Sequence, residues 1–219
     1  MTVDTSIPNI NEDAVVGFVG GVDSPVINDF LIGFIEGAQS VNPDIKVDTR
    51  YTNDYVDTSI AKEYGLSMIN DNKCDIIWGV AGNAGNGAAE AALETGKAWF
   101  IGVDSDQSPI INQYADGMTV TSAMKGLAAT VKTLLTDTVA GNFDLHAGKV
   151  ENLGLVSGDD LTLNYVGLPV ETTEWNDTFT VDDYTALVKA MVDGKVTVSS
   201  DITVRPETTI AVNYNGNIK

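Results

Sequence analysis

The chain has 219 residues, of which 43% are hydrophobic, and its 12 basic and 31 acidic residues give a formal charge of −19. A chain of this length can bury a substantial core, either as one large α/β domain or as two small ones. The acidity excludes nucleic acid as a partner, because phosphate contacts need a basic footprint, and it disfavours an anionic membrane surface.

Apolar runs and turn residues predict alternating strands and helices in the first part of the chain. The predicted strands are 14–19, 45–51, 74–80 and 99–103. The predicted helices are 25–41, with Ser24 as N-cap and Pro25 at its first position, 57–70, capped by Asp57 or Thr58, and 88–96. The strand at 74–80 has no period of its own, which is typical of a strand buried on both faces.

The second part is predicted to be more mixed. It contains a short helix at 108–115, a strand at 118–122, a helix at 124–139, two or three strands within 146–170, a helix at 180–193 capped by Thr180 or Asp182, and a polar, β-rich end. This order predicts an α/β fold, a doubly wound parallel sheet with an antiparallel appendix. We expect residues 1–13 to be a disordered tail or linker, 14–198 one ligand-binding lobe, and 199–219 a C-terminal strand or tail.

Cys74 is the single cysteine, so an internal disulfide is excluded, and its apolar neighbours predict a buried thiol. The first residues have neither a basic start nor an apolar segment, so we expect no signal peptide within them. No apolar run approaches the roughly 20 residues that a membrane span needs. We therefore expect a soluble globular protein.

The unit from Lys73 to Gln107 is predicted to organise the site. It is a strand, a glycine turn, a helix and a second strand, and parallel strands of this kind bind ligands beyond their carboxyl ends. Those ends are the loop 79–86 and the turn 104–107. The segment GVAGNAGNG (79–87) contains Gly82, Gly85 and Gly87, which match neither the dinucleotide nor the phosphate-loop pattern. They either let backbone N–H groups approach a ligand or simply form a tight turn.

Asp104 and Asp106 follow directly after the second strand of this unit. Two carboxylates there could be an acid and a base, metal ligands, acceptors for the hydroxyl groups of a sugar, or parts of a solvated turn. Lys125 is predicted to begin a helix, where the helix dipole disfavours a cation, so it has either another task or a plain surface position. His146, the only histidine, is predicted to be a surface residue.

Three aromatic residues, Tyr51, Tyr55 and Trp78, lie near predicted strand ends. Each could stack on a planar ligand or pack in the core, and the core is the default for Trp78.

Six motifs occur in an order that resembles the basic membrane protein family, the substrate-binding lipoproteins of ABC transporters whose characterised members bind purine nucleosides. The motifs are VGFVGG (16–21), PVINDFLIGFIEGA (25–38), YTNDYVD (51–57), WGVAGNAGNG (78–87), IGVDSDQ (101–107) and TSAMKG (121–126). The resemblance covers about residues 14–198. It implies a type I periplasmic-binding-protein fold, with two α/β lobes that close on a ligand.

The resemblance also implies roles for single residues. Tyr55 would stack on the base, Gly82 and Asn83 would line the cleft, Asp104 would accept hydrogen bonds from the ribose hydroxyls, and Lys125 would complete that polar network. Members of the family begin with a signal peptide, a lipidated cysteine and a first half-lobe, and this chain resembles the family from the second lobe onward. We therefore expect the strand at 118–122 to lack its parent sheet, so that it repacks or finds a partner chain.

The leading interpretation is a solute-binding component of an ABC transporter, or a part of one, that binds a purine nucleoside without chemistry and without a cofactor. The implied partners are a transporter permease and a missing N-terminal lobe or partner chain, and the implied location is extracytoplasmic, at the cell surface or in the periplasm. The alternative is a metal-dependent hydrolase of a nucleoside or phosphate ester that uses Asp104 and Asp106. A third class, a sensor lobe, would need a fusion partner.

Overall fold

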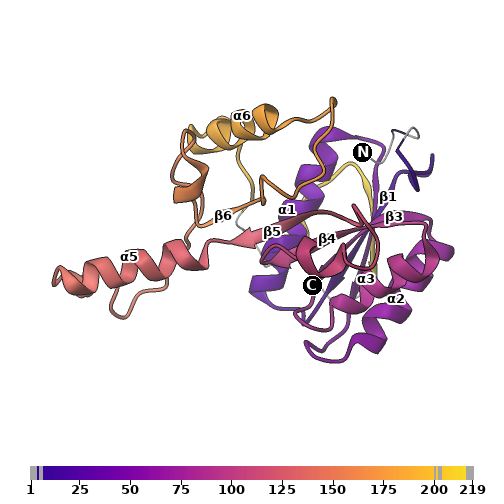
Figure 1. Ribbon diagram of the computed structural model, residues 1–219, viewed down its shortest axis with the longest axis horizontal. Helices are drawn as coiled ribbons and strands as arrows, with labels where there is room; N and C mark the ends of the chain where they lie inside the picture. Colours follow the sequence, from indigo (N-terminus) through magenta and orange to yellow (C-terminus); the bar gives the residue numbers. More distant parts are fainter. Residues whose placement is uncertain (1–3, 5–6, 200, 202–203, 216–219) are drawn as a thin grey trace.

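One seven-stranded sheet runs through the computed structural model, which describes residues 4, 7–199, 201 and 204–215 (Figure 1). The strands are β1 (Val15–Gly20), β2 (Lys46–Tyr51), β3 (Cys74–Val80), β4 (Trp99–Asp104), β5 (Thr119–Lys125), β6 (Val166–Gly167) and β7 (Ala211–Asn215). Their order in the sheet is β6-β5-β4-β3-β1-β2-β7. Only β6 is antiparallel to its neighbour, so the predicted parallel sheet with an antiparallel appendix is confirmed.

The helices are α1 (Pro25–Val41), α2 (Thr58–Asn70), α3 (Asn86–Thr95), α4 (Ser108–Ile111), α5 (Leu127–Val139) and α6 (Val181–Val192), with 3-10 turns η1 (Phe143–Leu145) and η2 (Leu161–Leu163). Figure 1 shows α1 on one face of the sheet, α2 and α3 on the other, and α5 projecting away from both. Within the described residues, no helix combines the length and apolar character of a membrane span.

The two faces of the central strands fill two separate cores. On the face of α1, Phe18 and Trp78 pack with Leu31. On the opposite face, Ile77 and Phe100 pack against α2 and α3. Both faces of β1 and β3 are thus covered by helices, and every residue of these two strands is buried. This double burial explains why the strands show an unbroken apolar run instead of an alternating pattern.

Small residues let α2 and α3 approach closely. A Cβ atom added to Gly87 would lie 2.0 Å from the Thr58 carbonyl oxygen, and one added to Gly65 would lie 2.7 Å from the Ala91 Cβ. The alanines of α3 are buried on the same side. Gly87, one of the three glycines of the predicted loop, therefore serves helix packing.

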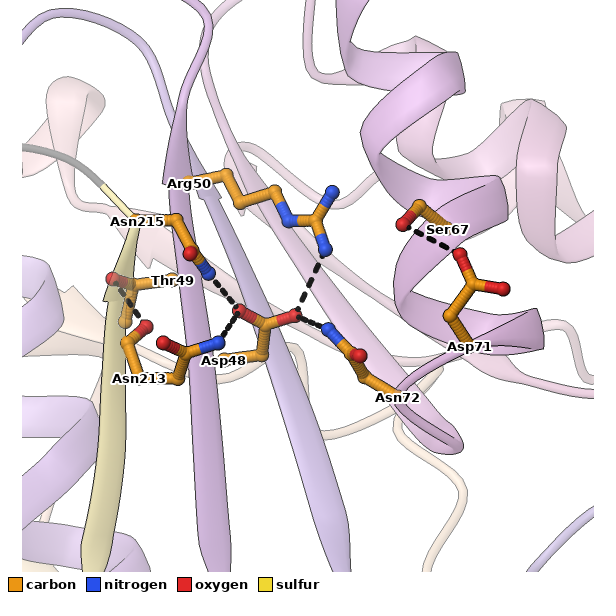
Figure 2. A network of polar contacts seen from close by, with 8 residues as sticks. All are labelled: Asp48, Thr49, Arg50, Ser67, Asp71, Asn72, Asn213 and Asn215. Carbon is orange, nitrogen blue, oxygen red and sulfur yellow. Dashed lines mark hydrogen bonds and ion pairs between the residues drawn. The ribbon is translucent and has the colours of Figure 1, made fainter.

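A buried carboxylate attaches β7 to the sheet (Figure 2). Asp48 of β2 accepts hydrogen bonds from Asn215 Nδ2 at 2.6 Å and from Asn213 Nδ2 at 3.4 Å. Its other oxygen accepts from Asn72 Nδ2 at 2.5 Å and from Arg50 Nη2 at 3.3 Å. Four donors from three segments converge on one buried acidic group, which no sequence motif predicted.

The described part of the N-terminal segment packs on the domain. Ile10 is buried in the core on the α1 side, and Trp99 Nε1 donates to the Pro8 carbonyl at 2.7 Å. Asn11 Nδ2 donates to the Lys73 carbonyl at 2.9 Å. Residues 7–13 are therefore ordered against the sheet and are not the free tail that we expected, whereas residues 1–3 and 5–6 lie outside the described part.

Of the two expectations around β5, one is wrong. The strand at 118–122 repacks, which is one of the two expected outcomes, because β5 pairs with β4 in parallel and buries Thr119 and Ser122. Lys125 does not begin a helix: β5 continues to Lys125, Gly126 intervenes, and α5 starts at Leu127. The helix-dipole argument about Lys125 therefore does not apply, since backbone pairing with β4 extended the strand into the predicted helix.

The region 146–170 contains one short strand, β6, and the turn η2, not the two or three strands predicted. Its apolar residues Val150 and Val156 stay exposed. The reason is that a β-strand is stabilised mainly by packing against a neighbouring strand. Here β5 pairs with Val166–Gly167, and no other described strand pairs with this region.

The helix α6 has the predicted cap. The Thr180 hydroxyl accepts a hydrogen bond from Asp183 N, and Asp183 completes a capping box.

Candidate functional site

A carboxylate and an ammonium group meet at the carboxyl ends of β4 and β5. Asp104 ends β4 and lies in register with Met124, the residue before Lys125. Lys125 Nζ donates to Asp104 Oδ1 at 2.6 Å. The two side chains retain 38% (Lys125) and 48% (Asp104) of their accessible surface. The predicted pair is thus assembled and open to solvent at the edge where parallel sheets bind ligands.

The pair has spare hydrogen-bonding capacity. Among the described residues, Lys125 is the side-chain partner of Asp104, through Oδ1, so Oδ2 can accept hydrogen bonds from a ligand. The ammonium group lies 5.2 Å from the ring centroid of Phe30 on α1, a cation–π distance. In the sequence, Phe30 lies on the apolar face of a predicted helix, a position that indicates core packing alone.

Tyr55 lies at the same edge, in the segment between β2 and α2, with 42% of its surface exposed. Its ring lies on Gly21: a Cβ atom added there would be 2.2 Å from Tyr55 Cε1. Its carbonyl accepts from Ala84 N at 3.1 Å in the glycine loop. Glycine at position 21 therefore lets the aromatic ring lie over the end of β1 while part of the ring stays exposed.

The glycine loop is shaped by backbone requirements. Gly82 is exposed and has φ +55°, a conformation that side chains rarely adopt. Asn83 donates from Nδ2 to the Val56 carbonyl at 2.8 Å and accepts from Asn86 Nδ2 at 3.3 Å. The Asn83 side chain is therefore used to brace the loop against the Tyr55 segment.

The other two aromatic candidates are core residues. Tyr51 is buried, and its hydroxyl donates to Asn28 Oδ1 at 2.9 Å. Burial raises the pKa of Tyr51 well above its ordinary value, with Asp23 adding to the effect. Trp78 is buried too, and its indole donates to the Gly102 carbonyl at 3.0 Å. The core interpretation of Trp78 is confirmed.

Asp106 has a structural task. Its Oδ1 accepts from Ser108 N at 3.0 Å and from Ser108 Oγ at 2.6 Å, at the start of α4. Its Oδ2 accepts from Thr172 Oγ1 at 2.8 Å. Both oxygens thus hold the chain, so the paired use of Asp104 and Asp106 that a hydrolase would need is not supported. Within the described residues, no three acidic, histidine or cysteine side chains gather in a group that could hold a metal ion.

Cys74 and His146 lie outside this site. Cys74 is buried, and burial raises the pKa of its thiol far above the ordinary value, as expected for an inert core cysteine. His146 lies beyond α5, with Nδ1 2.8 Å from Glu151 and Nε2 2.9 Å from Asp137. Hydrogen bonds to Glu151 and then Asp137 raise the pKa of His146. The histidine therefore joins two acidic residues of the projecting region.

An α/β lobe with a parallel sheet and a polar site at the carboxyl ends of its strands defines a type I periplasmic-binding-protein-like module. Residues 10–192 match the family model described as "ABC transporter substrate-binding protein PnrA-like", and the chain belongs to this family.

Two curated relatives and one solved structure illustrate the similarity. The "ABC transporter nucleoside-binding protein BmpA" of Lactococcus lactis subsp. cremoris is 32% identical over 200 residues, covering 84% of this chain and 53% of that protein. "Basic membrane protein D" of Borreliella burgdorferi is 36% identical over 157 residues, covering 68% and 45%. A solute-binding protein of an ABC transporter system from Aeropyrum pernix K1 superposes with a TM-score of 0.58 at 24% identity, covering 83% and 51%. The chain thus spans about half the length of the proteins it matches.

Proposed function

We propose that this chain is the ligand-binding lobe of an ABC transporter substrate-binding protein, and that it binds a purine nucleoside or a similar small polar ligand. The observation that carries the proposal is the open Asp104–Lys125 pair at the carboxyl ends of β4 and β5. A carboxylate oxygen accepts charge-assisted hydrogen bonds from neighbouring sugar hydroxyls, and a lysine donates to a further ligand oxygen.

The remaining contacts suit the planar part of such a ligand. The exposed part of the Tyr55 ring offers a stacking surface, and Gly82 and Asn83 form the adjoining wall. One relative carries the words nucleoside-binding in its name, which supports this ligand class. We propose binding without chemical conversion, because the family consists of transport proteins and Asp106 is committed to the start of α4.

A nucleoside titration followed by two-dimensional NMR tests this function. We expect inosine or guanosine to shift the amide resonances around Tyr55, Gly82 and Lys125, and uncharged sugars without a base to shift them less. Asp104→Asn keeps the shape but removes the charge, and asparagine tolerates the positive φ of this position. It should weaken the binding, so that the shifts develop only at higher nucleoside concentrations. Asp116→Asn, at an exposed aspartate before β5, is the matched control and should leave them unchanged.

We expect the affinity of this chain alone to be low. A two-lobed clamp contacts its ligand from both sides, and losing about 3–4 kcal/mol of such contacts weakens binding by roughly two to three powers of ten. Submicromolar binding of a nucleoside to these 219 residues by isothermal titration calorimetry would contradict this expectation.

We further propose that an additional half-lobe, in the same polypeptide or in a partner chain, covers α5. Leu127, Val131, Leu135 and Val139 are spaced by four residues and form an exposed apolar stripe on it. Exposed stripes of this kind mark interaction surfaces. The relatives have about twice the length of the matched region, so they contain enough chain for such a segment. The family also supports an extracytoplasmic location and a transporter permease as the final partner.

A further inference from the structure

Asp104 has an uncommon backbone conformation. Its φ is +69°, and the Ser105 amide donates to the Val103 carbonyl at 2.8 Å across it. A hydrogen bond from residue i+2 to residue i over a positive φ is the pattern of a strained γ-turn. Such strain persists only where the surroundings hold it in place, and it concentrates at functional sites. The structure must therefore contain groups that hold this turn.

Gln107 makes three hydrogen bonds around the turn. Its Oε1 accepts from the Val103 amide at 2.8 Å, and its backbone amide donates to Ser122 Oγ of β5 at 3.1 Å. Its Nε2 donates to Asn86 Oδ1, at the start of α3, at 3.1 Å. The packing is close, because a Cβ atom added to Gly102 would lie 2.4 Å from Ser122 Oγ and 2.9 Å from Gln107 Oε1.

These bonds continue into the glycine loop. Asn86 Nδ2 donates to Asn83 Oδ1 at 3.3 Å, and Asn83 Nδ2 donates to the Val56 carbonyl at 2.8 Å. Three side-chain amides thus form one row in which every group donates in the same direction. The Val103 amide can only donate and the Val56 carbonyl can only accept, so both ends of the row determine the orientation of all three amides.

We propose that Asn83, Asn86 and Gln107 are positioning residues, an amide relay that holds the Tyr55 segment and the Asp104 turn at a fixed separation. This inference rests on the proposed function for the identity of the ligand. The relay sets the distance between the Tyr55 ring and the Asp104 carboxylate. It therefore selects ligands in which the planar part and the hydroxyl groups are separated by that same distance. Neighbouring amides also polarise one another, so a break at one end weakens the other end.

The test uses NMR of the full chain and three variants. Gln107→Ala removes one end of the relay. Asn86→Asp still accepts from Gln107 but cannot donate to Asn83, and a carboxylate at the start of α3 is favoured by the helix dipole, so the fold is retained. Gln113→Ala is the control, since Gln113 is exposed and donates only locally, to the Pro109 carbonyl.

In Gln107→Ala, we expect the Val103 amide to exchange at least about tenfold faster because its acceptor is lost. The one-bond Cα–Hα coupling of Asp104 should change toward that of a negative φ. The Asn83 side-chain amide, at the far end, should lose protection in Gln107→Ala and in Asn86→Asp, and keep it in Gln113→Ala. If the Asn83 amide or the Asp104 coupling is unchanged in Gln107→Ala, the relay is overturned.

A double-mutant cycle separates the relay from the ligand proposal. Nucleoside affinity should fall at least about threefold in Gln107→Ala, and the double variant with Asp104→Asn should bind no more weakly than Asp104→Asn alone. Additive losses would show that Gln107 does not act through Asp104 and would overturn the positioning role. If the wild-type chain shows no nucleoside-induced shift at all, the ligand proposal fails, and the exchange and coupling data alone decide the relay.

Discussion

At the residue scale, the site uses groups whose environments differ sharply. Asp104 and Lys125 remain half exposed and paired, whereas both carboxylate oxygens of Asp106 accept hydrogen bonds from Ser108 and Thr172. Two aspartates with one residue between them thus have different tasks. The difference comes from the turn at Asp104, which directs one carboxylate toward β5 and leaves the other to begin α4.

Asp75 is a second acidic residue with an unusual environment. It is fully buried, its Oδ2 accepts from the Asn11 amide at 3.3 Å, and no described residue donates to its Oδ1. Burial raises the pKa of Asp75 from 3.8 to about 6. Since the folded protein holds this proton more tightly than the unfolded chain, the contribution of Asp75 to stability is complete below pH 3.8 and is lost as the pH rises through about 6.

We therefore predict that the free energy of unfolding of the wild type, relative to Asp75→Asn, falls by up to about 3 kcal/mol between pH 4 and pH 7. Urea unfolding of both proteins at several pH values measures this difference. A difference that does not depend on pH would contradict the buried, protonated state of Asp75.

At the scale of elements, the α2–α3 pair depends on the absence of a side chain. A Cβ atom at Gly87 would collide with the Thr58 carbonyl and with Lys62 N, both backbone atoms. We predict that Gly87→Ala destabilises the fold by about 3 kcal/mol or more, because neither helix backbone can yield easily. Gly37→Ala is the control: Gly37 lies within α1 and a Cβ atom there meets nothing within 4 Å. It should stabilise the protein by about 0.5–1 kcal/mol through helix propensity. Thermal and urea unfolding measure the change in the free energy of unfolding for Gly87→Ala and for Gly37→Ala.

The attachment of β7 offers a second prediction at this scale. Asp48→Ala removes the common acceptor of Asn72, Asn213 and Asn215, and it removes the carboxylate that forms an ion pair with Arg50. We expect a loss of about 2–3 kcal/mol and easier proteolysis of the C-terminal segment, because hydrogen bonds to a charged group contribute more than neutral ones. Asp44→Ala, at an exposed aspartate just before β2, should change neither. Equal protease resistance in the wild type and Asp48→Ala would show that pairing with β2 alone holds β7.

At the scale of the whole molecule, the chain divides into a sheet with two cores and a projecting region with almost none (Figure 1). No described residue of α5 is buried. We predict that Val131→Glu together with Leu135→Glu changes the free energy of unfolding by less than about 0.5 kcal/mol, because no packing is lost. The same substitutions should lower the binding of a hydrophobic dye. Strong destabilisation, measured by urea unfolding, would mean that α5 packs on the lobe in solution.

The sequence alone was enough for the alternation of strands and helices up to β4, because local signals there agree with the tertiary contacts: Asp57 caps one helix, Gly96 ends another, and apolar runs mark buried strands. It was also enough for the family and for the placing of Asp104 at the carboxyl end of β4. Only the tertiary structure decided that β5 pairs with β4 and carries Lys125 to Asp104, that Asp106 accepts hydrogen bonds from Ser108 and Thr172, and that Asp48 gathers donors from three segments. The physical reason is range: caps and apolar runs act over a few residues, whereas strand pairing and side-chain hydrogen bonds join residues that are far apart in the chain.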